Sequence, residues 1–227
     1  TIARMAALKP AAPDFMILWD NAYCVHQFRG EYQPIADILS LCAWNGSPDM
    51  VYEFASTSKI TIPGAGMAVM AASQANIQYL SGLMDAQMIS CDKINQLRQV
   101  RFLKDKAHTL ELMQRHAALL RPRFDAFLTE LEKLRPLEIA RWTQPQGGYF
   151  ISLYTLPGCA KRTVELCRQA GLVMTQSGAA YPYGKDPEDR HIRIAPSYPA
   201  LEDVKTAAKV FCTCLKLAAL EKQNLVN

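Results

Sequence analysis

The chain has 227 residues, a formal net charge of +4 and a hydrophobic fraction of 50%. This length and composition suit one large domain or two smaller ones with an ample core. The charged residues are mixed rather than grouped, which argues against a nucleic-acid surface and against an anionic membrane as partner. No apolar run has membrane-spanning length and no signal peptide opens the chain, so we expect no membrane association.

The seven cysteines show no spacing typical of a metal site, and the four histidines show none either. An odd number of scattered cysteines favours reduced thiols over a disulfide framework. We therefore predict a cytoplasmic protein without a metal site.

The first part of the chain predicts alternating strands and helices. Three apolar runs have strand length, at 15–19, 50–54 and 67–72. The end of a helix is expected within 1–12, a second helix over 35–44, and a third that starts at 76–79. Because such apolar strands are typically buried on both sides, we expect helices on both faces of the sheet.

Apolar residues recur every three or four positions from Ile94 to Leu120, which predicts one continuous helix. The series extends to about Leu134 after Pro122, a residue that can kink or restart a helix. Shorter elements follow, with strands expected over 147–153, 172–174 and 191–195, and helices over 161–170 and 201–220.

The motif Asp20-Asn21-Ala22-Tyr23 directly follows the first apolar run. Asp20 therefore lies at the carboxyl end of a predicted strand, where open α/β sheets place ligand groups. A carboxylate there can pair with a pyridinium nitrogen, and a tyrosine three residues on can hydrogen-bond a phenolate oxygen of the same ring. Taken alone, the motif is more simply a turn after a strand.

The motif Ala55-Ser56-Thr57-Ser58-Lys59 follows the second apolar run, and a turn at 63–66 comes next. A lysine that is partly buried among small residues can lose its proton and act as a nucleophile in Schiff-base chemistry. Alone, this motif is more simply a surface lysine in a loop, and the Asp20 motif upstream changes that balance.

These two motifs, in this order, resemble those of the fold-type I pyridoxal-phosphate (PLP) aminotransferases. Pro145-Gln146-Gly147-Gly148-Tyr149-Phe150 is similar to that family's glycine-pair strand entry, and Arg193-Ile194-Ala195-Pro196-Ser197 is similar to its arginine-bearing strand. The residues around Lys59 are most similar to the MocR-type or aspartate-aminotransferase-like branch. The resemblance covers most of the chain as the carboxy-terminal part of such an enzyme, and we expect about half of a normal enzyme to lie upstream of Thr1.

The resemblance implies an α/β fold that contains part of the mixed seven-stranded sheet of the large domain and a small α+β C-terminal domain. The expected divisions are 1–90 for the large-domain part, 91–135 for a long connecting helix and 136–227 for the small domain. The resemblance also implies PLP as cofactor, an amino acid and a 2-oxo acid as substrates, and a homodimer.

It further implies roles for individual residues. Lys59 forms the Schiff base with PLP and moves a proton between the substrate Cα and the cofactor. Asp20 pairs with the ring nitrogen and Tyr23 with the phenolate oxygen, while Ser56 and Ser58 reach the phosphate.

Arg193 is expected to clamp the substrate α-carboxylate with a two-pronged bond. Strand alternation places His191 and Arg193 on one face as two basic groups, while Arg190 is a rival candidate nearer the loop. Most members of the family carry a phosphate-binding arginine seven or eight positions after the lysine, where this chain has Gly66 and Met67. What replaces that arginine is left open.

The leading interpretation is an aminotransferase of the EC 2.6.1 type, with aspartate as a candidate donor. The alternative is the effector domain of a MocR-type transcription regulator, which binds PLP without turnover. The chain shows no basic recognition helix, which favours the enzyme. A third alternative is an inactive fragment that serves in folding or dimerisation.

Overall fold

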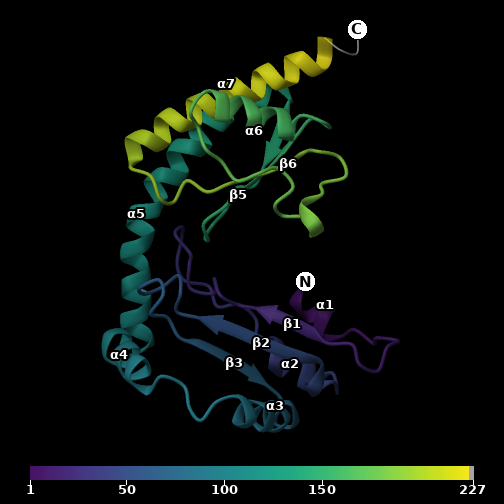
Figure 1. Cartoon of the computed structure of the whole chain (residues 1–227), viewed down its shortest axis with the longest axis vertical. Coiled ribbons are helices and arrows are strands. Elements are labelled where there is room, and N and C mark those ends of the chain that lie inside the picture. Colours follow the sequence, from purple (N-terminus) through teal and green to yellow (C-terminus); the bar gives the residue numbers. More distant parts are fainter. Residues whose placement is uncertain (225–227) are drawn as a thin grey trace. The chain divides into compact units, whose positions relative to one another are not determined.

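The computed structural model describes residues 1–224, which form two compact units. The first unit comprises residues 1–27 and 31–114. The second comprises residues 28–30 and the described chain from Arg115 to Asn224. Figure 1 shows the helices and strands of both units.

A three-stranded sheet forms the centre of the first unit (Figure 1). Strands β1 (Ile17–Asp20) and β2 (Val51–Ser56) are parallel, and β3 (Ala68–Ala72) runs antiparallel to β2. Asp20 pairs with Phe54, so the carboxyl ends of β1 and β2 lie at the same edge. All three apolar runs expected to be strands are confirmed, and the sheet is mixed.

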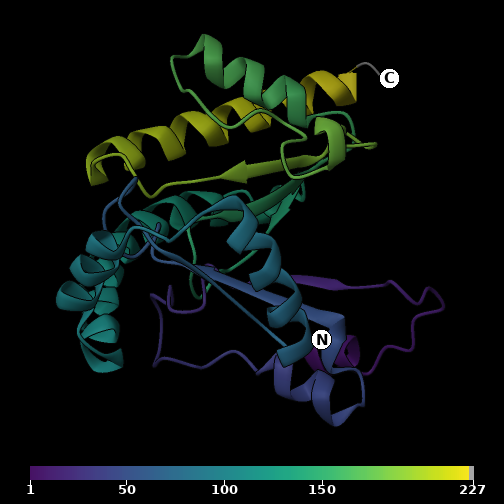
Figure 2. The same ribbon diagram turned by 60° about the horizontal axis from the view of Figure 1, so that its bottom comes forward.

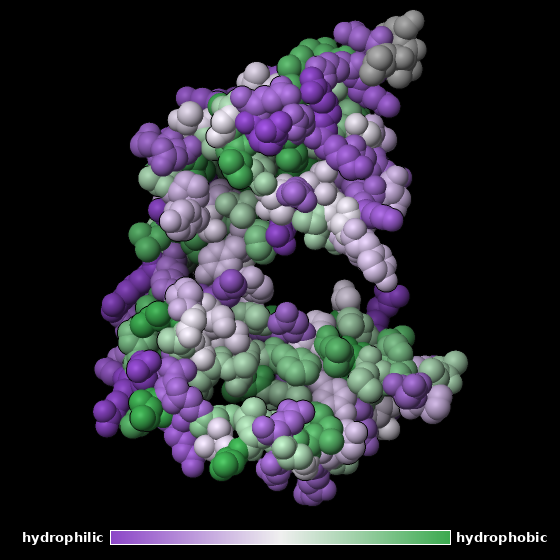
Figure 3. All heavy atoms as spheres, viewed as in Figure 1, coloured by the Kyte–Doolittle hydropathy of each residue, from purple (hydrophilic) through white to green (hydrophobic). Residues whose placement is uncertain are grey.

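One face of this sheet is covered by helices α1 (Ile2–Ala6) and α2 (Ile38–Trp44). The small core between them consists of Ala6, Ile17, Ile38, Cys42, Met50 and Val51. Strand side chains alternate, so the neighbours of these residues point to the other face, where Leu18 is 67% exposed and Phe54 37% exposed. Figure 3 shows hydrophobic side chains on the visible surface of this unit. On the face that carries Leu18 and Phe54, Tyr52 and Met70 are half-buried, and the expectation of helices on both faces stays a prediction.

Helices α3 (Gln74–Gln87), α4 (Lys93–Leu103) and α5 (Lys106–Glu132) follow the sheet along the chain. Lys104 has a φ of 59°, which ends α4. The side chain of Asp105 then accepts the backbone N–H of His108 at 2.8 Å and caps the first turn of α5. The prediction of one continuous helix across this point is wrong, because apolar periodicity does not show the change of backbone direction.

Helix α5 itself continues through Pro122. The division between the two units falls inside α5, between Gln114 and Arg115. The domain assignment drawn from the resemblance, with its divisions at 1–90, 91–135 and 136–227, stays an interpretation. Short 3-10 turns occur at η1 (Pro48–Met50), η2 (Arg135–Leu137) and η3 (Pro182–Gly184).

The second unit contains an antiparallel sheet of β4 (Ala140–Trp142), β5 (Ile151–Thr155) and β6 (His191–Ile194), in that order. Helices α6 (Ala160–Gln169) and α7 (Leu201–Asn224) lie side by side (Figures 1 and 2). The sequence did not predict β4, and it predicted a strand at 172–174 that the structure does not contain. The predicted strand at 147–153 starts instead at Ile151, and the other expected elements of this unit are confirmed.

The core of the second unit is large and rich in aromatic residues. The Phe28 and Phe124 rings lie 4.6 Å apart, and the Phe127 and Phe211 rings 5.6 Å apart. Phe28 belongs to the short segment that this unit takes from the beginning of the chain, and its carbonyl accepts a hydrogen bond from Arg121 Nε at 2.8 Å. Sheet, helices and this segment therefore share one hydrophobic core.

Candidate active site

The Asp20 motif forms a turn that is attached to the neighbouring strand. The backbone N–H of Asn21 donates to the Phe54 carbonyl at 2.7 Å, and its side-chain amide donates to Glu53 Oε1 at 2.6 Å. Asp20 Oδ1 accepts the N–H of Ala22 at 3.2 Å. The Asp20 side chain is exposed at the carboxyl edge of the sheet. Its position there is the one predicted from the sequence.

The Lys59 turn begins directly after Ser56, the last residue of β2. Thr57 exchanges two hydrogen bonds with Met67, since its N–H donates to the Met67 carbonyl at 2.8 Å and its hydroxyl accepts the Met67 N–H at 2.9 Å. The Thr57 carbonyl also accepts the N–H of Ile60 at 2.9 Å. Lys59 is exposed in the described structure, so the partial burial expected for it is not found there.

His26 connects the two motifs. It is 3% exposed, and its Nε2 lies 3.2 Å from the Lys59 carbonyl oxygen. Its ring meets the Tyr23 ring edge-on with 5.2 Å between the centroids. The buried His26 ring thus lies between the Tyr23 and Lys59 segments and contacts both.

Gly66, which stands at one of the two positions where most members of the family carry the phosphate-binding arginine, lies in close contact with Ser58. A Cβ atom on Gly66 would lie 3.1 Å from Ser58 Oγ, 3.2 Å from its backbone nitrogen and 3.3 Å from its Cα. Any side chain at position 66 therefore has to displace the residue directly before Lys59. Met67 is in turn held by its two hydrogen bonds to Thr57. A glycine at position 66 permits the close approach of these two backbone segments.

Arg193 lies in the second unit, in the middle of β6 and opposite Ser152 of β5. Its neighbours Ile192 and Ile194 are 0% and 2% exposed in the core, so the predicted alternation of this strand is confirmed. The guanidinium lies over the Phe150 ring at 4.6 Å, and its Nε is buried without a hydrogen-bond partner among the described residues.

The Arg193 side chain also lines a cavity of about 180 Å³. The remaining lining is mostly apolar and includes Phe127, Leu172, Met174, Pro196 and Val204. A buried guanidinium nitrogen that lacks an acceptor indicates a place for an anion or another acceptor group.

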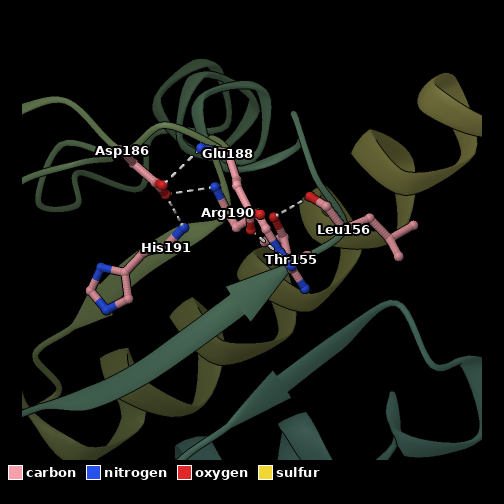
Figure 4. Close-up of polar contacts among 6 residues, drawn as sticks. All are labelled: Thr155, Leu156, Asp186, Glu188, Arg190 and His191. Carbon is pink, nitrogen blue, oxygen red and sulfur yellow. Dashed lines mark hydrogen bonds and ion pairs between the residues drawn. The ribbon is translucent and has the colours of Figure 1, made fainter.

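The loop before β6 is held by Asp186 (Figure 4). Its carboxylate accepts the backbone N–H groups of Glu188 at 3.1 Å, Arg190 at 2.7 Å and His191 at 2.7 Å. Arg190 Nε donates to the Thr155 carbonyl at 3.1 Å, and its Nη1 donates to Glu188 at 3.0 Å. Arg190, the rival candidate, thus has structural partners, whereas Arg193 Nε has none among the described residues.

His191 is 5% exposed, and its Nε2 lies 2.8 Å from Ser152 Oγ. Burial lowers the pKa of His191 below its usual value, Asp186 acts in the opposite direction, and nearby Arg193 lowers it further. The imidazole is therefore neutral at neutral pH. The expectation of two basic groups on this strand face is wrong, because Arg193 alone carries the charge.

Within residues 1–224, no helix is long and apolar enough to cross a bilayer. No group of three or more His, Cys, Asp or Glu side chains in this part of the chain is placed to hold a metal ion.

The structure shows two polar residues that hold the Lys59 turn and to which the sequence assigned no role, Thr57 and Gln99. Gln99 of α4 is 4% exposed and binds the Ala65 carbonyl, and Thr57 joins the turn to Met67. Thr57 was visible inside the lysine motif. Gln99 had no sequence signal, because the apolar periodicity of its helix indicated a different inward face.

Comparison with known proteins gives consistent findings along almost the whole chain. The family described as "Aspartate amino-transferase" matches residues 1–226. A Mycolicibacterium smegmatis protein named as a candidate aminotransferase is 46% identical over 222 residues, or 97% of this chain and 52% of its own length. An aspartate aminotransferase of Corynebacterium glutamicum is 41% identical over 219 residues, which cover 96% of this chain and 51% of the relative.

Solved structures agree. The crystal structure of an aspartate transaminase from Corynebacterium glutamicum matches with a TM-score of 0.95 and 40% identity, covering 97% of this chain and 52% of that one. The chain thus spans about half the length of the curated relatives it matches.

Proposed function

Since this chain belongs to the aspartate aminotransferase family, we propose that it is the part of a PLP-dependent aminotransferase that carries the cofactor lysine and the substrate-carboxylate arginine. The fold is the α/β fold of fold-type I aminotransferases, in part. The observation that supports this function best is the parallel pairing of β1 with β2, because it brings Asp20 and the Lys59 turn to one edge of the sheet. The name of the Corynebacterium glutamicum relative supports aspartate as one of the amino donors.

The residues at this edge fit PLP by their chemistry. PLP supplies an aldehyde that condenses with amines and a protonated ring that withdraws electrons. The Lys59 amine would hold the cofactor and would act as the base for the proton on the substrate Cα. The Asp20 carboxylate would keep the ring nitrogen protonated, and the Tyr23 hydroxyl would donate to the phenolate oxygen. Ser56 and Ser58 offer hydroxyl donors to the phosphate.

The phosphate of PLP has no arginine to bind directly behind the lysine. A side chain at position 66 would have to move Ser58 by a few tenths of an ångström, and this chain has glycine there. Hydroxyl groups and backbone N–H groups are therefore the donors that this segment can provide, and they bind phosphate oxygens well when several converge.

Arg193 is the proposed anchor of the substrate α-carboxylate. Its planar guanidinium offers two parallel N–H groups to a carboxylate, a geometry that lysine cannot copy. The Phe150 ring, whose centroid lies 4.6 Å from the guanidinium carbon, stabilises the guanidinium over its face by a cation–π contact. The amino acid and the 2-oxo acid both carry this carboxylate, so one residue can serve both half-reactions.

We extend the proposal to a homodimer in the cytoplasm. The dimer follows from the resemblance to fold-type I enzymes. All seven cysteines carry free thiols in the structure, as expected in a reducing compartment such as the cytoplasm. The relatives described above carry the names of aminotransferases, and no observation favours the effector domain of a regulator as the function.

The test is to fix PLP on the protein with borohydride and to locate the pyridoxyl group by mass spectrometry. The protein is used in the longest form that its gene encodes. We expect the label on Lys59 in the wild type and in a Lys93→Ala control, and none at this site in Lys59→Ala. Label on another lysine, or no label, contradicts the assignment.

The role of Arg193 is tested in the same protein by half-reaction kinetics with aspartate and with alanine. Arg193→Lys should weaken the apparent affinity for both donors by at least about tenfold, because the two-pronged bond is lost. PLP uptake should stay nearly unchanged. Unchanged affinity for both donors would return Arg193 to a structural role. PLP uptake without any half-reaction in the wild type would favour the regulator alternative.

A further inference from the structure

Helix α4 turns a polar side chain inward and leaves its apolar side chains exposed. Gln99 is 4% exposed, whereas Ile94 is 75%, Leu97 49% and Val100 58% exposed. Gln99 is also the one buried residue described for this helix. Burying an amide costs free energy unless it is hydrogen-bonded. The hydrogen bond that Gln99 makes therefore explains why this face of α4 points inward.

Gln99 binds the loop that follows the Lys59 turn. Its Nε2 donates to the Ala65 carbonyl at 2.6 Å, and Asn95, one helical turn earlier, donates from Nδ2 to the Gly66 carbonyl at 3.2 Å. Residues four positions apart lie on the same face of a helix. Two side chains of α4 therefore hold two consecutive carbonyls of this loop.

The same loop is packed against the residues that precede Lys59. The Gly66 backbone approaches Ser58 so closely that an added Cβ would lie 3.1 Å from Ser58 Oγ. The next residue, Met67, exchanges hydrogen bonds with Thr57 at 2.8 and 2.9 Å. The contacts thus run without a gap from α4 through the 65–67 loop to Thr57 and Ser58.

We propose that Gln99, assisted by Asn95, is a positioning residue for the PLP lysine. By fixing the 65–67 loop, it holds Thr57 and Ser58, and through them it sets where the Ser58 hydroxyl and the Lys59 amine lie. A turn that is already ordered loses less entropy when the cofactor binds. This inference rests on the function proposed for Lys59.

One hydrogen bond of Gln99 can be removed while its packing is kept. Gln99 Oε1 is buried without a partner among the described residues, so the donation to Ala65 is the bond to remove. Gln99→Met keeps the length of the side chain and removes this donor. Gln96→Met makes the same chemical change at an exposed position of the same helix and is the matched control.

The experiment compares these variants in the longest form that the gene encodes, with three measurements. The first is hydrogen exchange of the segment 57–67 without PLP. The second is the PLP dissociation constant, and the third is the pH midpoint of the visible absorbance of bound PLP. Loss of one hydrogen bond should raise the dissociation constant about fivefold to tenfold, speed exchange in 57–67 and shift the pH midpoint. Gln96→Met should change none of the three.

A second variant keeps the test decisive if Gln99→Met does not fold. Gly66→Ala pushes Ser58 from the other side of the contact and should weaken PLP binding in the same direction. Its control is Gly82→Ala, where a Cβ meets nothing within 4 Å.

Faster exchange with an unchanged dissociation constant and pH midpoint would show that Gln99 is merely structural and overturn the inference. Unchanged exchange would overturn it as well. Wild-type protein that takes up no PLP at Lys59 contradicts the proposed function itself and removes the role of Gln99 toward the cofactor. The borohydride label and the exchange rate thus tell the two failures apart.

Discussion

The two units differ in how completely their strands and helices are covered. In the second unit, Ile151, Leu153 and Ile192 of the sheet are fully buried, and α7 buries apolar residues along most of its length. In the first unit, the core contains six buried side chains, Leu18 and Phe54 are exposed on one sheet face, and α3 buries no residue. Buried apolar area provides most of the stability of a fold. The large core of the second unit therefore stabilises that unit by itself, whereas the first unit depends on a much smaller core.

This difference matters for the chemistry. Arg193 is held on a strand whose neighbours are packed in the large core, which suits a residue that has to present a fixed fork to a carboxylate. Lys59 lies in an exposed turn of the less covered unit, where hydrogen bonds from Thr57, His26 and the 65–67 loop provide the order. The candidate substrate anchor is thus positioned by packing, and the candidate cofactor lysine by polar contacts.

The largest effect that can break this comparison is expected from Phe124→Ala. Phe124 is 0% exposed and packs on Phe28, so its removal should lower the unfolding free energy of the second unit by about 3–5 kcal/mol. Pulsed thiol labelling over a denaturant series measures each unit separately. Cys42 is buried in the first core, and Cys167 is buried in the second. Burial raises the pKa of Cys167 to about 12, with Cys214 adding to the shift, so its thiol should react only after unfolding.

Wild-type protein should expose Cys42 at lower denaturant than Cys167. Phe124→Ala should move the Cys167 transition and leave the Cys42 transition in place. Equal shifts at both thiols would show that the chain unfolds as one cooperative unit. The two cores would then have no separate unfolding free energies to compare.

A pair of variants on β1 sharpens the comparison further. Ile17 is 7% exposed and faces the core, so Ile17→Ala should destabilise the first unit by about 2–4 kcal/mol. Leu18 is 67% exposed on the opposite face, and Leu18→Ala should cost less than about 0.5 kcal/mol. Cys42 labelling reports both. A cost at Leu18 close to that at Ile17 would mean that another segment or molecule covers this face in solution.

Local sequence patterns predicted most elements of both units but not what covers them. The run before Asp20 has strand length, and Gly171, directly after the end of α6, has a left-handed φ of 83°, which favours glycine at a helix end. The periodicity from Ile94 to Leu120 predicted a continuous core-facing helix, whereas Lys104 interrupts it and Ile94 is 75% exposed. Apolar spacing records that residues can share a face, and only the tertiary fold decides whether that face is covered.

The candidate site divides in the same way. Asp20 and Lys59 could be placed at strand ends because each follows an apolar run, and the structure puts both at one edge of the sheet. Their roles stay predictions. The contacts of His26 and Gln99 could not be predicted, because each joins segments that are more than 30 positions apart in the chain.

The smallest effect expected concerns acid and should be confined to the second unit. His191 lies among the Tyr154 and Tyr181 rings, Ser152, Asp186 and Arg193, and burial lowers its pKa in the folded protein. The unfolded chain takes up a proton near pH 6.5, which the folded protein resists. Stability therefore falls as the pH drops below about 6.5, and this loss ends below the pKa of the folded state.

Between pH 7 and pH 5 this single group should lower the stability of the second unit, with the loss growing as the pH falls. Burial by itself would raise the pKa of Asp186, but three backbone N–H groups outweigh it and lower the pKa, so Asp186 stays ionised over this range. The glutamine in His191→Gln cannot titrate. Subtracting the Cys167 labelling curves of this variant from those of the wild type removes the pH dependence that all other titratable groups contribute to both proteins. The difference should grow from pH 7 to pH 5 in favour of the variant, while Cys42 should show none. A pH-independent difference would mean that folding does not change the pKa of His191, and the lowered pKa would be contradicted.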